Sequence, residues 1–449
     1  MKLKSCFLIM LMVCAFFSCS DNDEPVNLTI TPVVPDATLS LAVQTDNRVK
    51  TKGGFIADGT GDITWDYKVN TLTAVVFNNG AYGDILGKGH IADVFTSKYN
   101  IATKTPTLEV EVHSGGIMLL LIANLDVDGQ IVKDLRASAA SSDASKHLSY
   151  QDVLALTTSL SDEGDVKGLT MSSELLTGLN IVPGVNYIGF DNKGANKPYN
   201  DGTEIWGQGP VDLVRTVSAI TLEKIDLPTV SGEIYQSVKF EPKEVFVANV
   251  KSTAGIGASS TDNITIEQTA KDGVYYLAPA EYFKETGSLK YGISSEAPAG
   301  TVLLEKLSEV TLEVGNAFEP KLSPCYVYPN QRGEADFAKT EDITDPRNYT
   351  LLVVKGDYTY RLIDDPTNTP VTEENRYYTV IVNDKRFGEM DYSGSTEHEH
   401  IKRNTKYNIK LSIQGSGSDK PFTPAAFAHV AAKIEVADWN VINIEQPVD

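Results

Sequence analysis

Two histidines, His398 and His400, flank Glu399 and form the pattern in this chain that comes closest to a metal site. Imidazole nitrogens are good zinc ligands. A zinc-binding helix, however, spaces its histidines four residues apart, so that both lie on one face. Here they follow the turn-forming stretch 393–396, Ser-Gly-Ser-Thr. The spacing therefore favours a solvent-exposed loop, and we predict no metal and no other cofactor.

Two further stretches resemble ligand-binding loops without completing the pattern. Residues 126–129, Asp-Val-Asp-Gly, could open a calcium loop, but its twelfth position, where a bidentate carboxylate belongs, is Ala137. A plain turn is the simpler interpretation. The glycine-rich stretch 415–419 lacks the Lys-Ser/Thr pair and the helix of a phosphate loop, and we expect a flexible loop there.

Nucleophilic chemistry also finds little support. Cys325 lies in Pro-Cys-Tyr-Val-Tyr, a strand-like context in which a buried thiol is the usual outcome. The sequence contains neither a nucleophile-elbow pattern nor a cysteine-protease pattern. We therefore predict a protein that is not an enzyme.

The cysteine with the clearest role is Cys19. Residues 1–18 combine two early lysines with an apolar run of about a dozen residues, too short to span a bilayer as a helix, which is typical of a signal peptide. The end of this run resembles a bacterial lipobox. We therefore expect cleavage before Cys19 and lipidation of its sulfur, making the precursor an outer-membrane lipoprotein held on the membrane by its acyl chains. The acidic run 21–24 resembles the surface-export signal of Bacteroidetes lipoproteins. The alternative is a conventional signal peptide with incidental cysteines.

Composition narrows the class of protein further. The 449 residues are enough for two or three domains, and two is the default expectation. A net charge of −21 argues against a nucleic-acid partner, because phosphate binding needs clustered cations. Of the four cysteines only Cys325 lies beyond Cys19, so we expect no intramolecular disulfide in the mature chain. The 34 glycines and 20 tyrosines indicate a β-rich chain with many turns.

The segment after Cys19 divides into three parts. Residues 22–36 are polar and contain prolines, which suits an extended tether. Residues 38–45 then alternate, which places Leu39, Leu41 and Val43 on one face of a half-buried strand. The cationic stretch 47–54 ends in two glycines, and we expect an exposed loop there that proteases can reach.

The remaining chain has two β-rich halves. In the first half we predict a helix at 150–160 and strands at 72–77, 108–112, 117–125 and 216–222, with 117–125 buried on both faces. In the second half we predict strands at 245–250, 302–304, 326–328, 350–354, 358–362, 377–382 and 406–413. Segments 216–222 and 430–436 align without gaps, and we expect each to be the closing strand of its half.

The last residues form a strand-like tail. Trp439 and Val441 would share one face, while Ile442 and Ile444 take the other. Nothing follows them in the sequence, so they must pack on their own domain or on another molecule. Both a last strand of the second half and a strand donated to another molecule remain open.

Taken in order, these features resemble the fimbrillins, the major fimbrial subunits of Bacteroidales, also called type V pilins. The resemblance covers nearly the whole chain. It is carried by the following phrases: Gly-Leu-Thr-Met-Ser-Ser at 168–173, residues 215–222, Tyr-Val-Tyr at 326–328, Ile-Lys-Arg-Asn-Thr-Lys-Tyr-Asn-Ile at 401–409, and Ala-Lys-Ile-Glu-Val at 432–436.

The resemblance implies an all-β protein of two transthyretin-like β-sandwich domains with a short helical insertion, behind a lipoprotein signal peptide. Its parts would be the signal peptide 1–18, a lipidated propeptide 19–48 with a removable strand, an N-terminal domain 49–225 and a C-terminal domain 226–449 with a donor-strand tail. It also implies assembly by strand exchange, with other copies of the chain and accessory fimbrial subunits as partners. The mature form would lie at the cell surface in a fimbrium that supports adhesion.

In this interpretation an arginine-specific protease cuts between Arg48 and Val49 and releases the strand of Leu39, Leu41 and Val43. The tail of a neighbouring copy, with Trp439, Val441, Ile442 and Ile444, then fills the vacated groove. Two other functions remain open. A fimbrial anchor or tip subunit would differ in whether it keeps its first strand or has a usable tail. A surface lipoprotein that binds glycans or host proteins would use exposed aromatic side chains, with Trp65 and Trp206 as candidates.

Overall fold

The computed structural model describes residues 34–41, 43–44, 69–83, 86–98, 108–163, 167–189, 205–206, 211–229, 235–248, 250–251, 253–257, 275–276, 304–322, 324–329, 350–382, 389–392, 401–419 and 430–438. Strands dominate these residues, with two short α-helices. Residues from Pro35 onward form one compact unit, so the expected division into 49–225 and 226–449 stays a prediction. None of the helices in the described ranges is long and apolar enough to cross a membrane.

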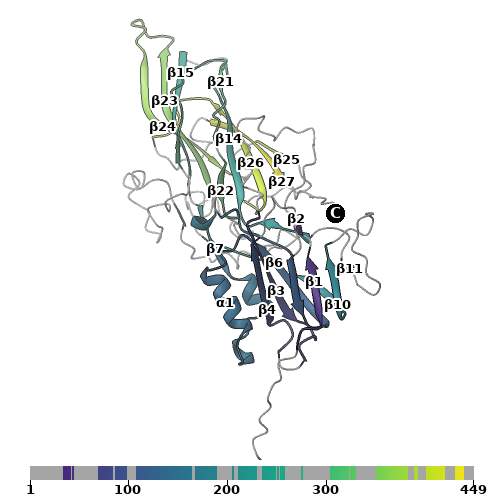
Figure 1. Ribbon diagram of the computed structural model, residues 1–449. Helices are drawn as coiled ribbons and strands as arrows, with labels where there is room; N and C mark the ends of the chain where they lie inside the picture. Colours follow the sequence, from purple (N-terminus) through teal and green to yellow (C-terminus); the bar gives the residue numbers. More distant parts are fainter. Residues whose placement is uncertain are drawn as a thin grey trace, which may run out of the picture. The chain divides into compact units, whose positions relative to one another are not determined.

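The larger sheet of the first half is built on two apolar strands. β3 (Thr71–Asn78) and β6 (Gly115–Ala123) pair antiparallel (Figure 1), and almost every side chain in them is buried. The predictions of strands at 72–77 and 117–125 are thus confirmed. The sheet order is β13 (Val214–Arg215), β8 (Met171–Ser172), β6, β3 and β4 (Ile91–Lys98), and β9 (Leu176–Ile181) also pairs with β6.

The smaller sheet of the first half contains the N-terminal strand. Its order is β11 (Ile205–Trp206), β10 (Gly184–Ile188), β1 (Ala37–Leu41) and β5 (Leu108–Val112). β5 coincides with the predicted strand. Just beyond β1, the two-residue strands β2 (Val43–Gln44) and β12 (Val211–Asp212) pair in parallel.

Two helices cover the β3–β4 face away from β1. α1 (Gln130–Ala139) buries Val132 and Leu135 in a cluster with side chains of β3, β4 and β6. The sequence did not predict α1. α2 (Tyr150–Leu154) begins with a capping box between Ser149 and Asp152. It is shorter than the predicted helix 150–160, because the chain turns into β7 (Thr157–Ser159), with the 3₁₀ turns Ala144–Lys146 and Leu160–Asp162 nearby.

The second half also has two principal sheets. One has the order β21 (Ala317–Phe318), β14 (Ser218–Asp226), β26 (Thr405–Ile413), β27 (Val430–Asp438) and β25 (Glu389–Tyr392), with β22 (Cys325–Val327) on β14. The other has the order β19 (Leu304–Lys306), β15 (Tyr235–Ala248), β23 (Leu351–Leu362) and β24 (Val371–Ile381), with β20 (Leu312–Glu313) on β15. β16 (Val250–Lys251) pairs with β18 (Tyr275–Tyr276).

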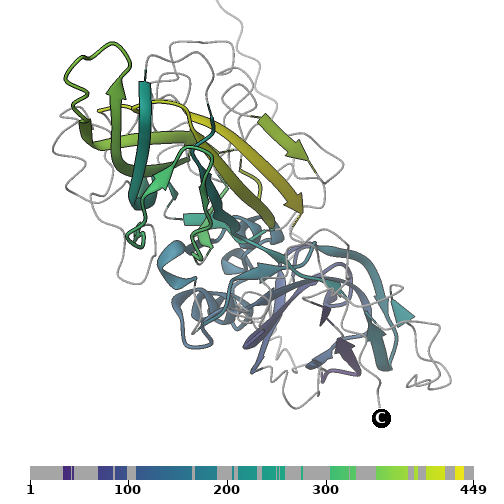
Figure 2. The same cartoon turned by 90° about the horizontal axis from the view of Figure 1, so that it is seen from above.

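Two strand predictions in this region are wrong. The segment 216–222 does not close the first half, because β14 pairs in parallel with β26 and antiparallel with β22 (Figure 2). The segments 350–354 and 358–362 are one strand, β23, which continues through Gly356. A Cβ on Gly356 would lie 2.5 Å from Cε2 of Phe240, so glycine is needed there for close packing rather than as a strand end.

Candidate functional site

β1 occupies a central place in its sheet, although it is the first described strand of the chain. It runs parallel to β10 and antiparallel to β5, so both of its edges are paired. Among the described residues β5 has no partner strand other than β1. β1 is therefore the strand that joins β5 to the rest of the sheet, and its removal would expose two unpaired strand edges. We call the space that β1 fills, between β10 and β5, the β1 site.

The inward face of β1 belongs to the hydrophobic core. Leu39 and Leu41 have zero exposure, and Ala37 is 4% exposed. Each lies opposite an equally buried residue of β5, in the pairs Ala37 with Val112, Leu39 with Val110 and Leu41 with Leu108. Leu39 and Leu41 share the inward face as predicted, but Ser40 between them is 4% exposed, so β1 is more deeply buried than the half-buried strand we expected. Val43 lies in β2 opposite Val211, and its side chain lies outside the described set.

Asp36, the residue immediately before β1, forms hydrogen bonds at the ends of both neighbouring strands, β5 and β10. The Asp36 carboxylate accepts hydrogen bonds from the Ser114 backbone N–H (2.7 Å) and hydroxyl (2.6 Å). Its carbonyl oxygen accepts one from Gly184 N–H at the start of β10 (3.0 Å). The two Ser114 bonds, the hydroxyl first, lower the pKa of Asp36, although its side chain is exposed. Sequence reasoning missed this residue; an aspartate directly before an alternating strand was the available signal.

A polar cluster joins the two halves of the chain. Glu163 accepts hydrogen bonds from the Tyr328 hydroxyl (2.8 Å), from Thr170 N–H (2.6 Å) and from the hydroxyls of Thr158 and Thr216 (3.3 Å each). Burial raises the pKa of Glu163 and of Tyr328. Glu163 and its threonine partners lie in the first half of the chain, whereas Tyr328 lies in the second. These hydrogen bonds therefore form only in the folded chain, where they connect the two halves.

A buried cation, Arg403, reinforces the same region. The Arg403 guanidinium donates to the carbonyl oxygens of Gly255 (2.7 Å) and Gly257 (2.6 Å), around β17 (Thr253–Gly255). β17 pairs with β7 of the first half, and Ile256 enters the cluster under α1. Burial lowers the pKa of Arg403 to about 10, so it stays charged at neutral pH. A segment of the second half is thus fixed into the first.

The other predicted site residues lie outside the described residues. They are Cys19, Arg48, Val49, Trp439, Val441, Ile442 and Ile444, together with the loop 398–400 and Trp65. Trp206 lies in β11, and its side chain lies outside the described set. β27 ends at Asp438, immediately before the tail, and pairs antiparallel with β26 along its full length.

The loops that resembled ligand sites are structural. Asp126 and Gly129 form the predicted plain turn (Gly129 N–H to Asp126 O, 2.9 Å), and this turn leads into α1, which was not predicted. The stretch 415–419 is not the free loop we expected: Arg376 donates to the carbonyls of Ser416 and Gly417 (2.8 Å each). Cys325 is half-buried in β22 rather than fully buried. No group of three or more potential metal ligands occurs in the described residues.

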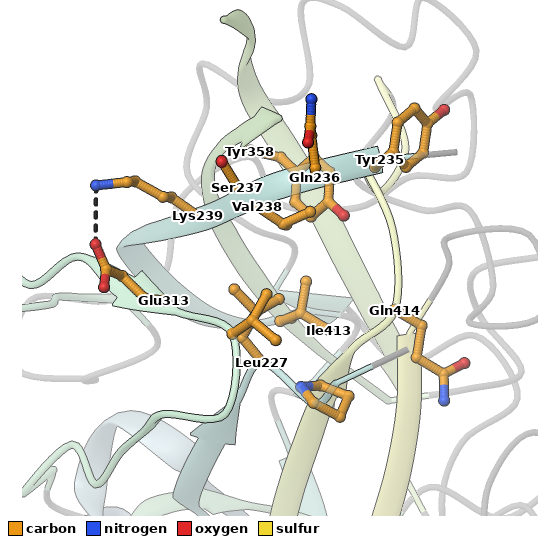
Figure 3. A pocket seen from close by; sticks show the side chains of 12 residues that line it. Leu227, Tyr235, Gln236, Ser237, Val238, Lys239, Glu313, Tyr358, Ile413 and Gln414 are labelled. Carbon is orange, nitrogen blue, oxygen red and sulfur yellow. Dashed lines mark ion pairs between the residues drawn. The ribbon is translucent and has the colours of Figure 1, made fainter. Parts of the chain in front are cut away.

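One cavity of about 500 Å³ opens between the two sheets of the second half. Figure 3 shows Leu227, Val238 and Ile413 directed into it, while the ion pair of Lys239 and Glu313 (3.0 Å) lies at its rim. Its apolar floor continues the core, and the polar side chains around it do not converge on one point. The cavity is therefore better described as an incompletely covered end of the hydrophobic core than as an active site.

Comparison with known proteins shows the family of this chain. The family profile of the "Major fimbrial subunit protein (FimA)" matches residues 37–215, from the first residue of β1 to the last of β13. The profile of the "FimA4 pilin C-terminal domain" matches residues 367–439. This chain belongs to the family of FimA major fimbrial subunits. The resemblance noted from the sequence is thereby confirmed.

Relatives of the FimA family match along nearly the full chain. Major fimbrium subunit FimA type-2 of Porphyromonas gingivalis is 25% identical over 452 residues, which covers 98% of each chain. FimA type-3 of the same organism is 25% identical over 458 residues, again 98% of each. FimA proteins are structural subunits of fimbriae and not enzymes, which agrees with the prediction from the sequence.

Solved structures show the same fold. A putative cell adhesion protein from Parabacteroides distasonis is 28% identical, with a TM-score of 0.60 over 91% of this chain and all of the other. A fimbrilin (fimA) from Porphyromonas gingivalis is 19% identical, with a TM-score of 0.52 over 91% of this chain and 99% of the other. The fold is therefore that of a fimbrilin.

Proposed function

We propose that this chain is a stalk subunit of a cell-surface fimbria, which polymerises when a protease removes β1 and the tail of another copy replaces it. The observation that carries the proposal is the position of β1: a five-residue strand near the N-terminus that is paired on both edges and fully buried on one face. The precursor would be lipidated at Cys19 and reach the outer membrane, and the mature subunit would be held at the cell surface by its neighbours in the fimbrium, supporting adhesion. Its two halves would be transthyretin-like β-sandwich domains.

The energetics of burial support strand exchange as the trigger for assembly. Truncating one buried leucine costs about 2–5 kcal/mol, and β1 contributes two leucines with no exposure. A typical domain is stable by only about 5–15 kcal/mol. A chain that has lost β1 would therefore keep little stability, and an incoming apolar strand would restore both the burial and the backbone pairing.

The cut after Arg48 fits this position. Arg48 follows β1 and the short strand β2, so cleavage there would separate β1 from the rest of the chain without cutting a described strand. An arginine-specific protease is the expected processing partner. The tail and the β1 site would be different surfaces of one subunit, so the contact would be head-to-tail and could continue into a filament.

The register of the incoming strand follows from the shape of the site. β1 places a small residue, Ala37, and then two leucines inward. In the tail, Ile442 and Ile444 have the same spacing as Leu39 and Leu41. We propose that they take these two places, with Asn440 at the place of Ala37 and Trp439 just outside the strand. The opposite register would force Trp439 toward the place of an alanine.

Deletion of residues 439–449 tests the stalk assignment. Full-length precursor and the deletion variant are treated with an arginine-specific protease and analysed for ladders on denaturing gels. A stalk subunit loses polymerisation with the deletion, whereas a tip subunit never polymerises by itself, even with the tail intact. A monomer that stays monomeric in both forms and binds a glycan array would favour the surface-binding lipoprotein instead. An anchor subunit would resist the protease and keep its N-terminal segment.

A further inference from the structure

The start of β1 carries contacts that its apolar face does not explain. Of the two described residues before Asp36, Val34 is 78% exposed, and Pro35 is exposed as well. Asp36 is therefore the first described residue at which the N-terminal segment is held. It reaches both sides of the β1 site, Ser114 after β5 and Gly184, the first residue of β10.

We propose that Asp36 is the clamp that fixes β1 in its site and sets its register, acting as a positioning residue for strand exchange. This inference rests on the exchange proposed above for the same site. The carboxylate is bound by both donors of one residue, the backbone N–H and the hydroxyl of Ser114. Hydrogen bonds to a charged acceptor are stronger than neutral ones, and two from one residue fix orientation as well as distance.

The geometry at Gly184 explains why the clamp also sets the register. Gly184 has φ +97°, in the region that favours glycine, and its N–H donates to the Asp36 carbonyl while Gly184 itself pairs with Ala37. A slip of β1 by one residue would move Leu39 and Leu41 to the outer face. It would also separate the Asp36 carboxylate from Ser114.

The clamp distinguishes the chain's own strand from a neighbour's. In the proposed register Trp439 of the incoming tail takes the place of Asp36, so the donor brings no carboxylate to Ser114. The chain's own N-terminal segment thus keeps the two hydrogen bonds from Ser114 to the Asp36 carboxylate, which the incoming tail cannot make. Asp36 favours the unexchanged precursor until cleavage allows β1 to leave.

Hydrogen exchange of the full-length precursor tests the clamp without any polymerisation. Asp36→Ala should raise the amide exchange rate of residues 37–41 about tenfold at neutral pH, the factor that corresponds to the loss of roughly one charge-assisted hydrogen bond. Ser114→Ala should raise it less, because the backbone N–H bond remains. The matched control is Asp143→Ala, since Asp143 accepts the same two kinds of bond from Ser145, N–H at 3.0 Å and hydroxyl at 2.7 Å, at the start of the 3₁₀ turn Ala144–Lys146. It should leave β1 unchanged.

A pH series separates a charged clamp from a loss of packing. The ratio of exchange rates, Asp36→Ala over wild type at the same pH, should fall toward one as the pH drops through the lowered pKa of Asp36, because the wild-type carboxylate is then protonated. His113 is the other titratable group that acts on Asp36, so the series is repeated in His113→Gln, where the same fall is expected.

The outcomes are distinct from those of the exchange mechanism. If Asp36→Ala protects β1 as well as wild type does, or if the ratio is independent of pH, the clamp is wrong, even when cleaved chains still polymerise. If the ratio behaves as expected but cleaved chains never polymerise, the clamp stands and the proposed function fails.

Discussion

The Tyr328 hydroxyl donates a 2.8 Å hydrogen bond to Oε1 of Glu163 and so connects the second half of this fimbrial subunit to the first. Tyr328 has zero exposure, and three threonines supply the other donors to the same carboxylate. A subunit that carries load along a fibre needs its halves to move together. This bond is one of the contacts that link them.

Tyr328→Phe removes this donor while keeping the ring. Because it leaves a buried carboxylate oxygen with one donor fewer, we expect the free energy of unfolding to fall by about 1–3 kcal/mol. Urea unfolding measures it. The control is Tyr360→Phe, whose hydroxyl bonds Glu373 at 3.3 Å in a less buried setting; its effect should stay below about 1 kcal/mol. Equal effects of the two changes would contradict the role of the Glu163 contact.

Glu163 itself should make stability depend on pH. Burial raises its pKa above the ordinary value of 4.5, so the folded chain binds this proton more tightly than the unfolded chain. The corresponding stability is fully present below pH 4.5 and is lost as the pH rises through the raised pKa. The difference in unfolding free energy between wild type and Glu163→Gln, measured by urea unfolding from pH 4 to 8, should therefore decrease with pH. A constant difference would show that Glu163 titrates normally.

The sequence predicts the regular strands well because their apolar periodicity is local. β5 and β6 were found from alternation and from an uninterrupted apolar run, respectively. α1 was missed because its apolar stripe is short, with Ile131, Val132 and Leu135 as its only strongly apolar members, and because the preceding Asp-Val-Asp-Gly resembles a calcium loop. β23 was split in two because Gly356 resembles a strand end unless its contact with Phe240 is known.

The candidate site was predicted in part for the same reason. Leu39 and Leu41 carry the alternation of β1 in their own sequence. The roles of Asp36, Glu163 and Arg403 depend on partners up to 165 residues away, such as Tyr328 for Glu163. No local pattern encodes such contacts.

Leu39→Ala tests how much β1 stabilises the precursor. Leu39 lies in the core between Val110 and the Asn186 backbone, so we expect a loss of about 2–5 kcal/mol in the free energy of unfolding. Val34→Ala, at a position 78% exposed just before β1, should change it by less than about 0.5 kcal/mol. Thermal or urea unfolding of the uncleaved chain gives both values. A small effect at Leu39 would mean that β1 is not part of the stabilising core.

The proposed register makes a sharp prediction for the tail. Ile442→Asp or Ile444→Asp would bring a charge to the buried place of a leucine, so either change should abolish ladder formation after protease treatment. Val441→Asp adds the same charge at the place of Thr38, the one residue of β1 that is only half-buried, and should impair polymerisation less. If Val441→Asp blocks polymerisation and Ile442→Asp does not, the register is shifted by one residue.

The most direct measurement is protease-triggered polymerisation of the purified full-length precursor carrying Arg48→Ala, compared with Lys50→Ala in the same cationic stretch 47–54, which the sequence predicts to be an exposed loop. Both chains are treated with an arginine-specific protease, resolved as ladders on denaturing gels, and sequenced at the new N-terminus. Wild type and Lys50→Ala should begin at Val49 and form ladders, while Arg48→Ala should keep β1 and stay monomeric. Ladders from Arg48→Ala as long as those of wild type would contradict the exchange of β1 as the basis of assembly.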